Sequence, residues 1–217
     1  MQPSEDWQIA PTGVSNLPNP FLNSLWPGIV AWSILYISDY SLTIICARLR
    51  RAGANEKIVV EGSYELTPYF QRDIDSLKLI SPRFLVALVW SMFLLALVWA
   101  LATSQSLPEL YYFVLGSMIL LELAIHVRHF RNLFLFWAIS HTDEIRGRIE
   151  YSRPLAYRMS SYDLLAFSGL FLLLFVFTQG WFVLGGAAGC LSTAVKHRKL
   201  AQKRPASTVA VQPSEQI

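Results

Sequence analysis

The sequence predicts an all-α polytopic integral membrane protein, and three observations carry this prediction. Of its 217 residues, 53% are hydrophobic and only 15% are charged, whereas ordinary soluble domains are about 25% charged. The mean hydropathy is +0.39, and runs such as residues 84–103 and 164–178 contain no Lys, Arg, Asp or Glu. The basic residues are confined to the segments between such runs. This composition argues against a disordered protein, a disulfide-stapled module and a water-soluble enzyme.

The apolar runs predict five transmembrane helices. A helix needs about 20 apolar residues to cross a hydrocarbon core of roughly 30 Å, and residues 27–47, 84–103 and 110–127 meet this length. Residues 162–195 carry a single charge, Asp163, and would measure about 51 Å as one helix. The Gln179-Gly180 pair near the middle of this stretch predicts a short hairpin with arms 162–178 and 181–195.

The distribution of charge predicts the orientation. All 18 Lys and Arg lie within residues 48–83, 128–158 and 196–204, and the positive-inside rule places such blocks in the cytoplasm. We therefore expect an extracytoplasmic N-terminal segment (1–26), a transmembrane domain (27–195) with cytoplasmic loops 48–83 and 128–161, and a disordered cytoplasmic tail (196–217). A re-entrant element within 162–195 would give the tail the same location. The absence of an organellar targeting segment favours a bacterial inner membrane.

Two connecting segments have features of their own. Thr67-Pro68 is a helix-start signal, and Phe70, Ile74 and Leu77 follow at three- and four-residue spacing. This pattern predicts an amphipathic helix of about 13 residues on the cytoplasmic membrane surface. The third span has no helix breaker after residue 127, so a single helix over residues 109–140 is expected.

Ionisable residues within the spans are the candidate functional groups, because they are costly in hydrocarbon and tend to mark function. Asp39 lies in the first span, and Glu122, His126 and His129 lie on one face of the third. All four approach the cytoplasmic ends of their helices, so we expect them to converge in the inner half of the bundle. Glu122 and His126, four residues apart, are expected to hydrogen-bond each other.

Three hypotheses fit this cluster. The leading one is a small ion, proton or solute transport protein that uses Asp39, Glu122 and His126. The first alternative is a non-catalytic scaffold or accessory subunit in which these side chains only hold helices together. A metal site formed by Glu122, His126 and His129 has weaker support. The motifs HExxH, GxGxxG, GxxxxGK[ST] and GxSxG are absent from the sequence, so no catalytic residue is assigned and a non-enzymatic role is favoured.

A second set of candidates is basic. Arginine forks bind phosphate groups, and anionic lipid headgroups on the cytoplasmic side are the expected partner. These residues are Arg128, Arg131, Arg146, Arg148, Arg153 and Arg158. A membrane enzyme acting on a phosphate-bearing lipid headgroup is therefore the second alternative.

We expect no cofactor and no nucleic-acid partner, and the sequence leaves open a homo-oligomer or a larger membrane complex. Cys46 and Cys190 are expected to be small buried side chains.

Overall fold

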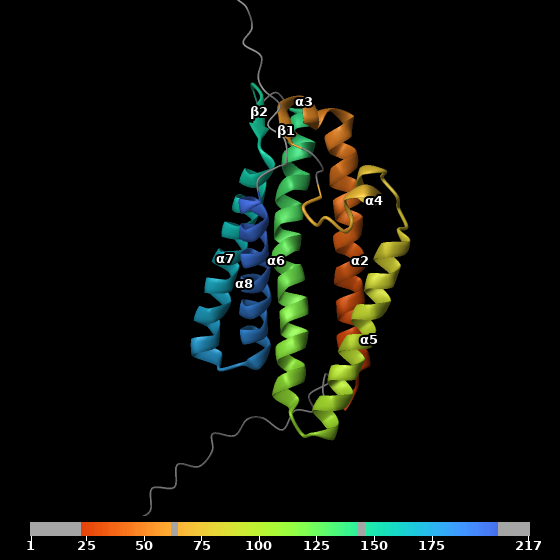
Figure 1. Cartoon of the computed structure of the whole chain (residues 1–217), viewed down its shortest axis with the longest axis vertical. Helices are drawn as coiled ribbons and strands as arrows, with labels where there is room; N and C mark the ends of the chain where they lie inside the picture. The colour runs from red at the N-terminus through yellow and green to blue at the C-terminus, as the bar shows by residue number, and fades with distance from the viewer. Residues whose placement is uncertain (1–22, 62–64, 143–145, 204–217) are drawn as a thin grey trace, which may run out of the picture.

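The computed structural model describes residues 23–61, 65–142 and 146–203 and shows an antiparallel helical bundle (Figure 1). The long helix α6 is central, with α2 and α5 on one side and the α7–α8 hairpin on the other. The elements are α2 (Trp26–Leu49), the π-helical turn η1 (Arg50–Ala54), α3 (Asn55–Lys57), β1 (Ile58–Val60), α4 (Gln71–Asp75), α5 (Pro82–Ser104), α6 (Pro108–His141), β2 (Ile149–Tyr151), α7 (Arg153–Thr178) and α8 (Trp181–Gln202).

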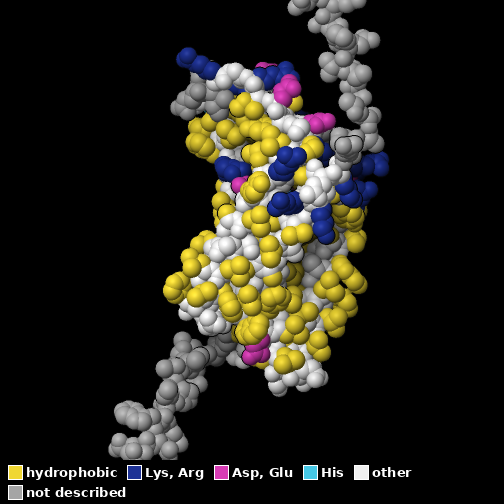
Figure 2. Space-filling model, turned by 60° about the vertical axis from the view of Figure 1, so that its left-hand side comes forward, with side chains coloured by type: hydrophobic (Ala, Val, Ile, Leu, Met, Phe, Trp, Pro, Cys, Tyr) yellow, Lys and Arg dark blue, Asp and Glu magenta, His cyan; other side chains and the backbone are white. Residues whose placement is uncertain are grey.

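Four of these helices are long and apolar enough to cross a membrane: Trp26–Lys57, Pro82–Ser104, Pro108–His141 and Arg153–Thr178. Their outward faces remain apolar, as in α5, where Val89 is 65% exposed, and α7, where Phe177 is 78% exposed. Figure 2 shows the apolar band, with Lys and Arg gathered toward one end of the bundle. Such a surface is typical of an integral membrane protein. We call the end at which α2 ends and α5 and α7 begin the basic end.

Prolines and short polar residues mark where the long helices begin. A proline stands in the first turn of α2, α5, α6 and α7, where its missing N–H costs nothing. Ser81 caps α5 by accepting a hydrogen bond from the Phe84 N–H. The predicted continuation of the third span past residue 127 is confirmed, because α6 runs without interruption to His141.

The predicted turn at Gln179-Gly180 is also confirmed. Gln179 adopts a left-handed conformation (φ 49°) between α7 and α8. The two arms are longer than expected, because α7 begins at Arg153 rather than near residue 162. At 1.5 Å per residue its 26 residues span about 39 Å.

The expected tail needs a correction. Helix α8 continues to Gln202, so residues 196–202 are helical rather than disordered. Residues 204–217 of the tail and residues 1–22 of the expected N-terminal segment lie outside the described residues.

Close backbone contact joins α8 to α6. An added Cβ at Gly185 would collide with the backbone carbonyl oxygen of Phe113, and one at Gly189 would lie 2.6 Å from the Ser117 carbonyl oxygen. Small residues let membrane helices approach in this way. The described structure therefore uses this glycine face within the chain. The predicted burial of the cysteines is confirmed, since Cys46 and Cys190 are both fully buried and free.

The segment between β1 and α5 differs from the expected 13-residue helix. Helix α4 has only five residues, because the Ser76 hydroxyl bonds back to the Arg72 and Asp73 carbonyls and Leu77 takes a left-handed conformation (φ 51°). Side-chain bonds of this kind compete with helix continuation. Ile74 is buried with Tyr40 of α2 and Phe84 of α5, so the apolar face of this segment packs on the bundle.

A parallel pair of strands closes the basic end. Strand β1 pairs with β2 in the register Ile58 to Ile149, and the Tyr157 hydroxyl of α7 donates to the Leu66 carbonyl at 2.8 Å. These bonds tie the segment after α2 to the start of α7.

Asp73 links α4 to the start of α5. Its buried carboxylate accepts hydrogen bonds from the Ser81 hydroxyl at 2.6 Å and from Lys78 Nζ at 3.3 Å. These contacts, the Ser81 bond above all, lower the pKa of Asp73. A carboxyl group with a lowered pKa stabilises the fold above its unfolded-state pKa of about 3.9, and this stabilisation is lost as the pH falls through the lower folded value.

We predict that Gly185→Ala lowers stability, because the added methyl group must push α8 away from α6. Overpacking of this kind costs about 1–3 kcal/mol. Gly169→Ala in α7 is the matched control, since nothing lies within 4 Å of its added Cβ; it should be neutral or stabilising by about 0.5–1 kcal/mol. Unfolding of the purified protein in detergent measures both. Equal stability of the two variants would contradict the close α6–α8 contact.

We also predict that Asp73→Asn lowers the melting temperature at pH 7 and that the gap to the unmodified protein closes below about pH 4. As the pH falls through the lowered pKa of Asp73, its carboxylate is protonated in the unmodified protein, so residue 73 is then uncharged in both proteins. Thermal unfolding between pH 7 and pH 3 tests this, with the exposed Asp75→Asn on the same turn as control. A gap that stays constant with pH would show that Asp73 acts through packing alone.

Candidate functional site

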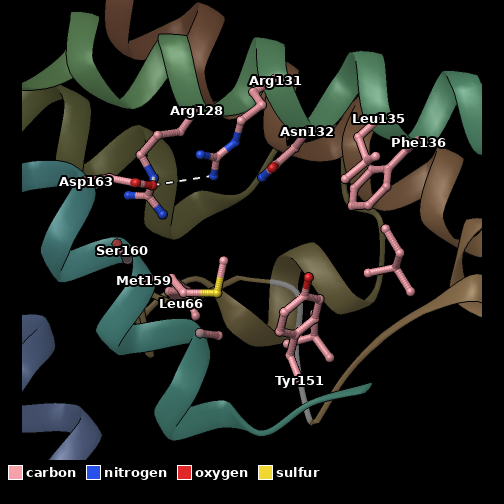
Figure 3. A pocket seen from close by; sticks show the side chains of 13 residues that line it. Leu66, Arg128, Arg131, Asn132, Leu135, Phe136, Tyr151, Met159, Ser160 and Asp163 are labelled. Atoms are coloured by element: carbon pink, nitrogen blue, oxygen red, sulfur yellow. Dashed lines mark hydrogen bonds and ion pairs between the residues drawn. The ribbon is translucent and has the colours of Figure 1, made fainter. Parts of the chain in front are cut away.

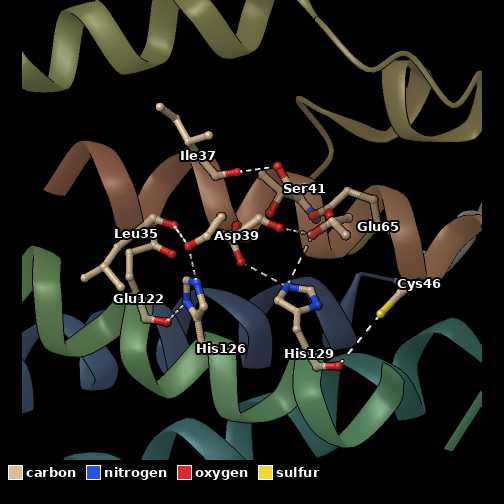
Figure 4. A network of polar contacts seen from close by, with 12 residues as sticks. Leu35, Ile37, Asp39, Ser41, Cys46, Glu65, Glu122, His126 and His129 are labelled. Carbon is tan, nitrogen blue, oxygen red and sulfur yellow. Dashed lines mark hydrogen bonds and ion pairs between the residues drawn. The ribbon is translucent and has the colours of Figure 1, made fainter. Parts of the chain in front are cut away.

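Polar side chains from α2 and α6 meet in the middle of the bundle (Figure 4). We call this set the α2–α6 cluster; it comprises Ser38, Asp39, Thr43, Glu122, His126 and His129. One ligand atom each of Asp39, Glu122 and His126 lies within 4.8 Å of the others. The structure thus brings together the four intramembrane residues singled out from the sequence.

His126 is held by hydrogen bonds at both ring nitrogens. Nδ1 lies 2.7 Å from the backbone carbonyl oxygen of Glu122, and Nε2 lies 2.7 Å from Ser38 Oγ. A carbonyl only accepts, so Nδ1 carries a proton. The expected hydrogen bond between the Glu122 and His126 side chains is wrong: the imidazole uses the backbone of its own helix and the hydroxyl of α2 instead.

Ser38 can serve His126 in two protonation states. Its hydroxyl also lies 2.9 Å from the Leu35 carbonyl oxygen. When His126 is neutral, the hydroxyl donates to Nε2. When His126 carries a second proton, Nε2 donates to the hydroxyl oxygen and the hydroxyl turns to donate to Leu35. Both forms of the ring therefore keep two hydrogen bonds in this buried setting.

The buried Glu122 carboxylate lacks part of its hydrogen bonding among the described residues. The residue is 7% exposed, and its Oε2 atom has no hydrogen-bond partner within the described part of the chain. Leaving a buried polar atom without a partner costs about 1–3 kcal/mol, and more when it is charged. Figure 4 shows the Glu122 side chain near Asp39 and His126, and one ligand atom of each of the three lies within 4.8 Å of the others.

Asp39 and His129 form the second half of the cluster. His129 Nε2 lies 3.1 Å from Asp39 Oδ1 and 3.3 Å from Thr43 Oγ1. The His129 side chain is 15% exposed and that of Asp39 is 23% exposed, so the pair is largely removed from the surface. An ion pair in such a place needs additional hydrogen bonds to offset the loss of hydration, and Thr43 contributes one.

Glu65 is a member of this region that the sequence did not indicate. It comes from the segment between β1 and α4 and points toward Asp39 and His129 (Figure 4). Burial of its carboxyl group raises the pKa of Glu65, and the Thr67 N–H that donates to Oε1 at 2.6 Å opposes the rise. Its position depends on the fold of that segment, for which the local sequence holds no signal.

The six arginines predicted to contact lipid headgroups do not form one cluster. Arg128 and Arg131 both pair with Asp163 of α7, at 3.5 and 3.4 Å. The other four are placed separately: Arg146 is exposed, Arg148 pairs with Glu150, Arg153 lies over the Tyr157 ring, and Arg158 lines a cavity with Arg198.

Comparisons with known protein families, with curated proteins and with solved structures give no match. The chemistry of the chain therefore has to be inferred from its own residues.

We predict that Ser38→Ala destabilises the protein by about 1–2 kcal/mol, because it removes a partner of the buried His126 ring. The double variant Ser38→Ala with His126→Leu should lose less than the sum of the single changes, because no ring then needs a partner. Unfolding in detergent measures this coupling.

Ser41→Ala is the matched control. It removes the same kind of hydroxyl from an exposed position on α2, where the hydroxyl donates to the Ile37 carbonyl of its own helix. Strict additivity of the Ser38 and His126 changes would mean that the two side chains do not act as a pair.

Proposed function

We propose that this chain is a small multi-pass membrane transport protein that takes up a cation in the α2–α6 cluster. The observation that carries the proposal is the buried Glu122 carboxylate, with one oxygen lacking a partner among the described residues and with Asp39 and His126 within 4.8 Å. A proton bound to that oxygen, or a metal ion beside it, would supply the partner that the oxygen lacks. Intramembrane carboxylates and histidines commonly mark ion and proton pathways.

The proposed topology has five spans, with the basic end in the cytoplasm of a bacterial cell. Helices α2, α5, α6, α7 and α8 run alternately in opposite directions along the bundle. Lys196, Arg198 and Lys199 near the end of α8 lie at the same end as the basic residues that follow α2. The positive-inside rule favours this orientation, with the N-terminal side of α2 outside.

A purely structural role fits the cluster less well. In a scaffold, the polar groups would exist to bind one another, and an unmatched carboxylate would weaken the packing it is meant to secure. Ser38 also gives His126 a full set of hydrogen bonds both before and after protonation. This is the property expected of a group that gains and loses a proton.

An enzyme that uses the α6 histidines and arginines on one lipid headgroup is also less favoured. Glu122, His126 and His129 face α2, as their contacts with Ser38 and Asp39 show. The Arg128 and Arg131 side chains reach Asp163 of α7 instead. The acidic and histidine side chains therefore lie on one side of α6, and the two arginines lie on another.

Two cations are compatible with these ligands. One imidazole and two carboxylates suit a divalent ion such as Mn²⁺, Fe²⁺ or Zn²⁺, and the same groups can relay a proton. The Nδ1–H of His126 donates to a carbonyl, as is typical of metal-binding histidines, and a metal ion at Nε2 would displace the Ser38 hydroxyl that lies 2.7 Å from it.

We predict that the purified protein in sealed liposomes dissipates an imposed pH gradient, or admits Mn²⁺, faster than empty liposomes do. An internal pH-sensitive dye reports the first process and a metal-quenched dye the second. Glu122→Gln should reduce the active process at least about tenfold, because the amide cannot ionise or bind a cation with the same charge.

Glu109→Gln is the matched control, because it makes the same chemical change on the same helix at an exposed position; it should leave the rate unchanged. Rates for the unmodified protein equal to those of empty liposomes for both H⁺ and Mn²⁺ would overturn the proposal. Equal loss in both Glu variants would show that the cluster is not the pathway.

A further inference from the structure

A second site lies on the other side of α6. A cavity of about 210 Å³ opens between the C-terminal half of α6, the start of α7 and the β1–β2 pair (Figure 3). It shares no residue with the α2–α6 cluster. It lies toward the basic end, where the apolar band of the bundle gives way to Lys and Arg (Figures 1 and 2).

One side of the cavity is positively charged. Arg128 and Arg131, one helical turn apart on α6, both point to the same carboxylate oxygen of Asp163, at 3.5 and 3.4 Å. Of the charged residues that line the cavity, two are arginines and one is an aspartate. Each guanidinium offers five N–H donors, and the Arg131 side chain is 58% exposed. A phosphate group can therefore reach this pair in the forked geometry that arginine favours.

Apart from Asn132, Ser160 and the Tyr151 hydroxyl, the remaining lining is apolar. Leu135 and Phe136 continue along α6 from the arginines, and Met159 faces them from α7. Met159 is 42% exposed, so this side opens outward. Methionine side chains adapt to irregular apolar ligands. The cavity is thus amphipathic, with a cationic end and an apolar end on one continuous surface.

We propose that this cavity binds an anionic membrane phospholipid, independently of any transport by the α2–α6 cluster. The phosphate group lies against Arg128 and Arg131, and the beginning of one acyl chain lies against Leu135 and Met159. A volume of about 210 Å³ is below the roughly 300–1,000 Å³ of pockets that enclose a whole drug-sized ligand. It therefore holds a phosphate group and the first part of a chain, and the rest of the lipid extends over the apolar outer surface.

The test compares three probes on the full-length protein in a mild detergent. Phosphatidylglycerol carries the anionic phosphate and the chains, phosphatidylcholine has the same chains without net charge, and glycerol 3-phosphate has the phosphate without chains. Phosphatidylglycerol should raise the melting temperature by several degrees and remain bound in native mass spectra. The other two should give less than half of this shift.

Two variants locate the binding. Arg131→Gln should raise the apparent dissociation constant for phosphatidylglycerol about tenfold, and Ala156→Trp, which fills the cavity from α7, should abolish the shift. Arg158→Gln is the matched control, because it removes the same charge from an exposed position of α7 outside this cavity; it should keep the shift. If Ala156→Trp fails to fold, Arg131→Gln and its control decide the question.

Several results would overturn the inference. Equal losses in Arg131→Gln and Arg158→Gln would show non-specific attraction of anionic lipid to the basic end. An equal shift with phosphatidylcholine would remove the role of charge. An equal shift with glycerol 3-phosphate would identify a soluble phosphate compound, and not a lipid, as the ligand.

Discussion

The close backbone approach of α6 and α8 is the constraint on which the rest of the bundle depends. Gly185 and Gly189 of α8 leave no room for a side chain against Phe113 and Ser117 of α6, so α6 cannot rotate about its axis without a collision. Every candidate group on α6 is oriented by this contact. Glu122 and His126 are directed toward α2, while Arg128 and Arg131 are directed toward α7. In a membrane, where apolar side chains gain little by leaving lipid, such van der Waals contact and polar bonding decide how helices associate.

The electrostatic character of the bundle follows from this placement. Facing α2, Asp39 lies against His129, whereas one oxygen of the buried Glu122 is left without a partner among the described residues. Facing α7, two arginines meet a single aspartate. The first side therefore favours a cation and the second an anion.

The sequence predicts the bundle well, because lipid imposes a strong requirement that apolar runs satisfy visibly. The helices and the continuation of α6 follow from the absence of charges and breakers over long stretches, and the turn follows from the Gln179-Gly180 pair that interrupts one of them. The contacts of individual side chains are harder to predict from the sequence. Spacing of four residues places Glu122 and His126 near each other, but the ring finds better acceptors in its own backbone and in Ser38. Glu65 could not be predicted as a neighbour, because strand pairing and the Tyr157–Leu66 bond position its segment.

The order of groups along α6 has a consequence for the proposed transport. The seven helical steps from Glu122 through His126 to His129 cover about 10 Å along the helix axis at 1.5 Å per residue. Asp39 lies beside this row, and Glu65 points toward its His129 end from outside the helices. A proton entering from the basic end would meet Glu65 and the Asp39–His129 pair first, then the His126 ring, and then Glu122. Because Ser38 can turn its hydroxyl to either partner, His126 can keep its hydrogen bonds with one or with two ring protons. Glu122 lies farthest from the basic end, and its unmatched oxygen makes it the group at which a cation would be held most strongly.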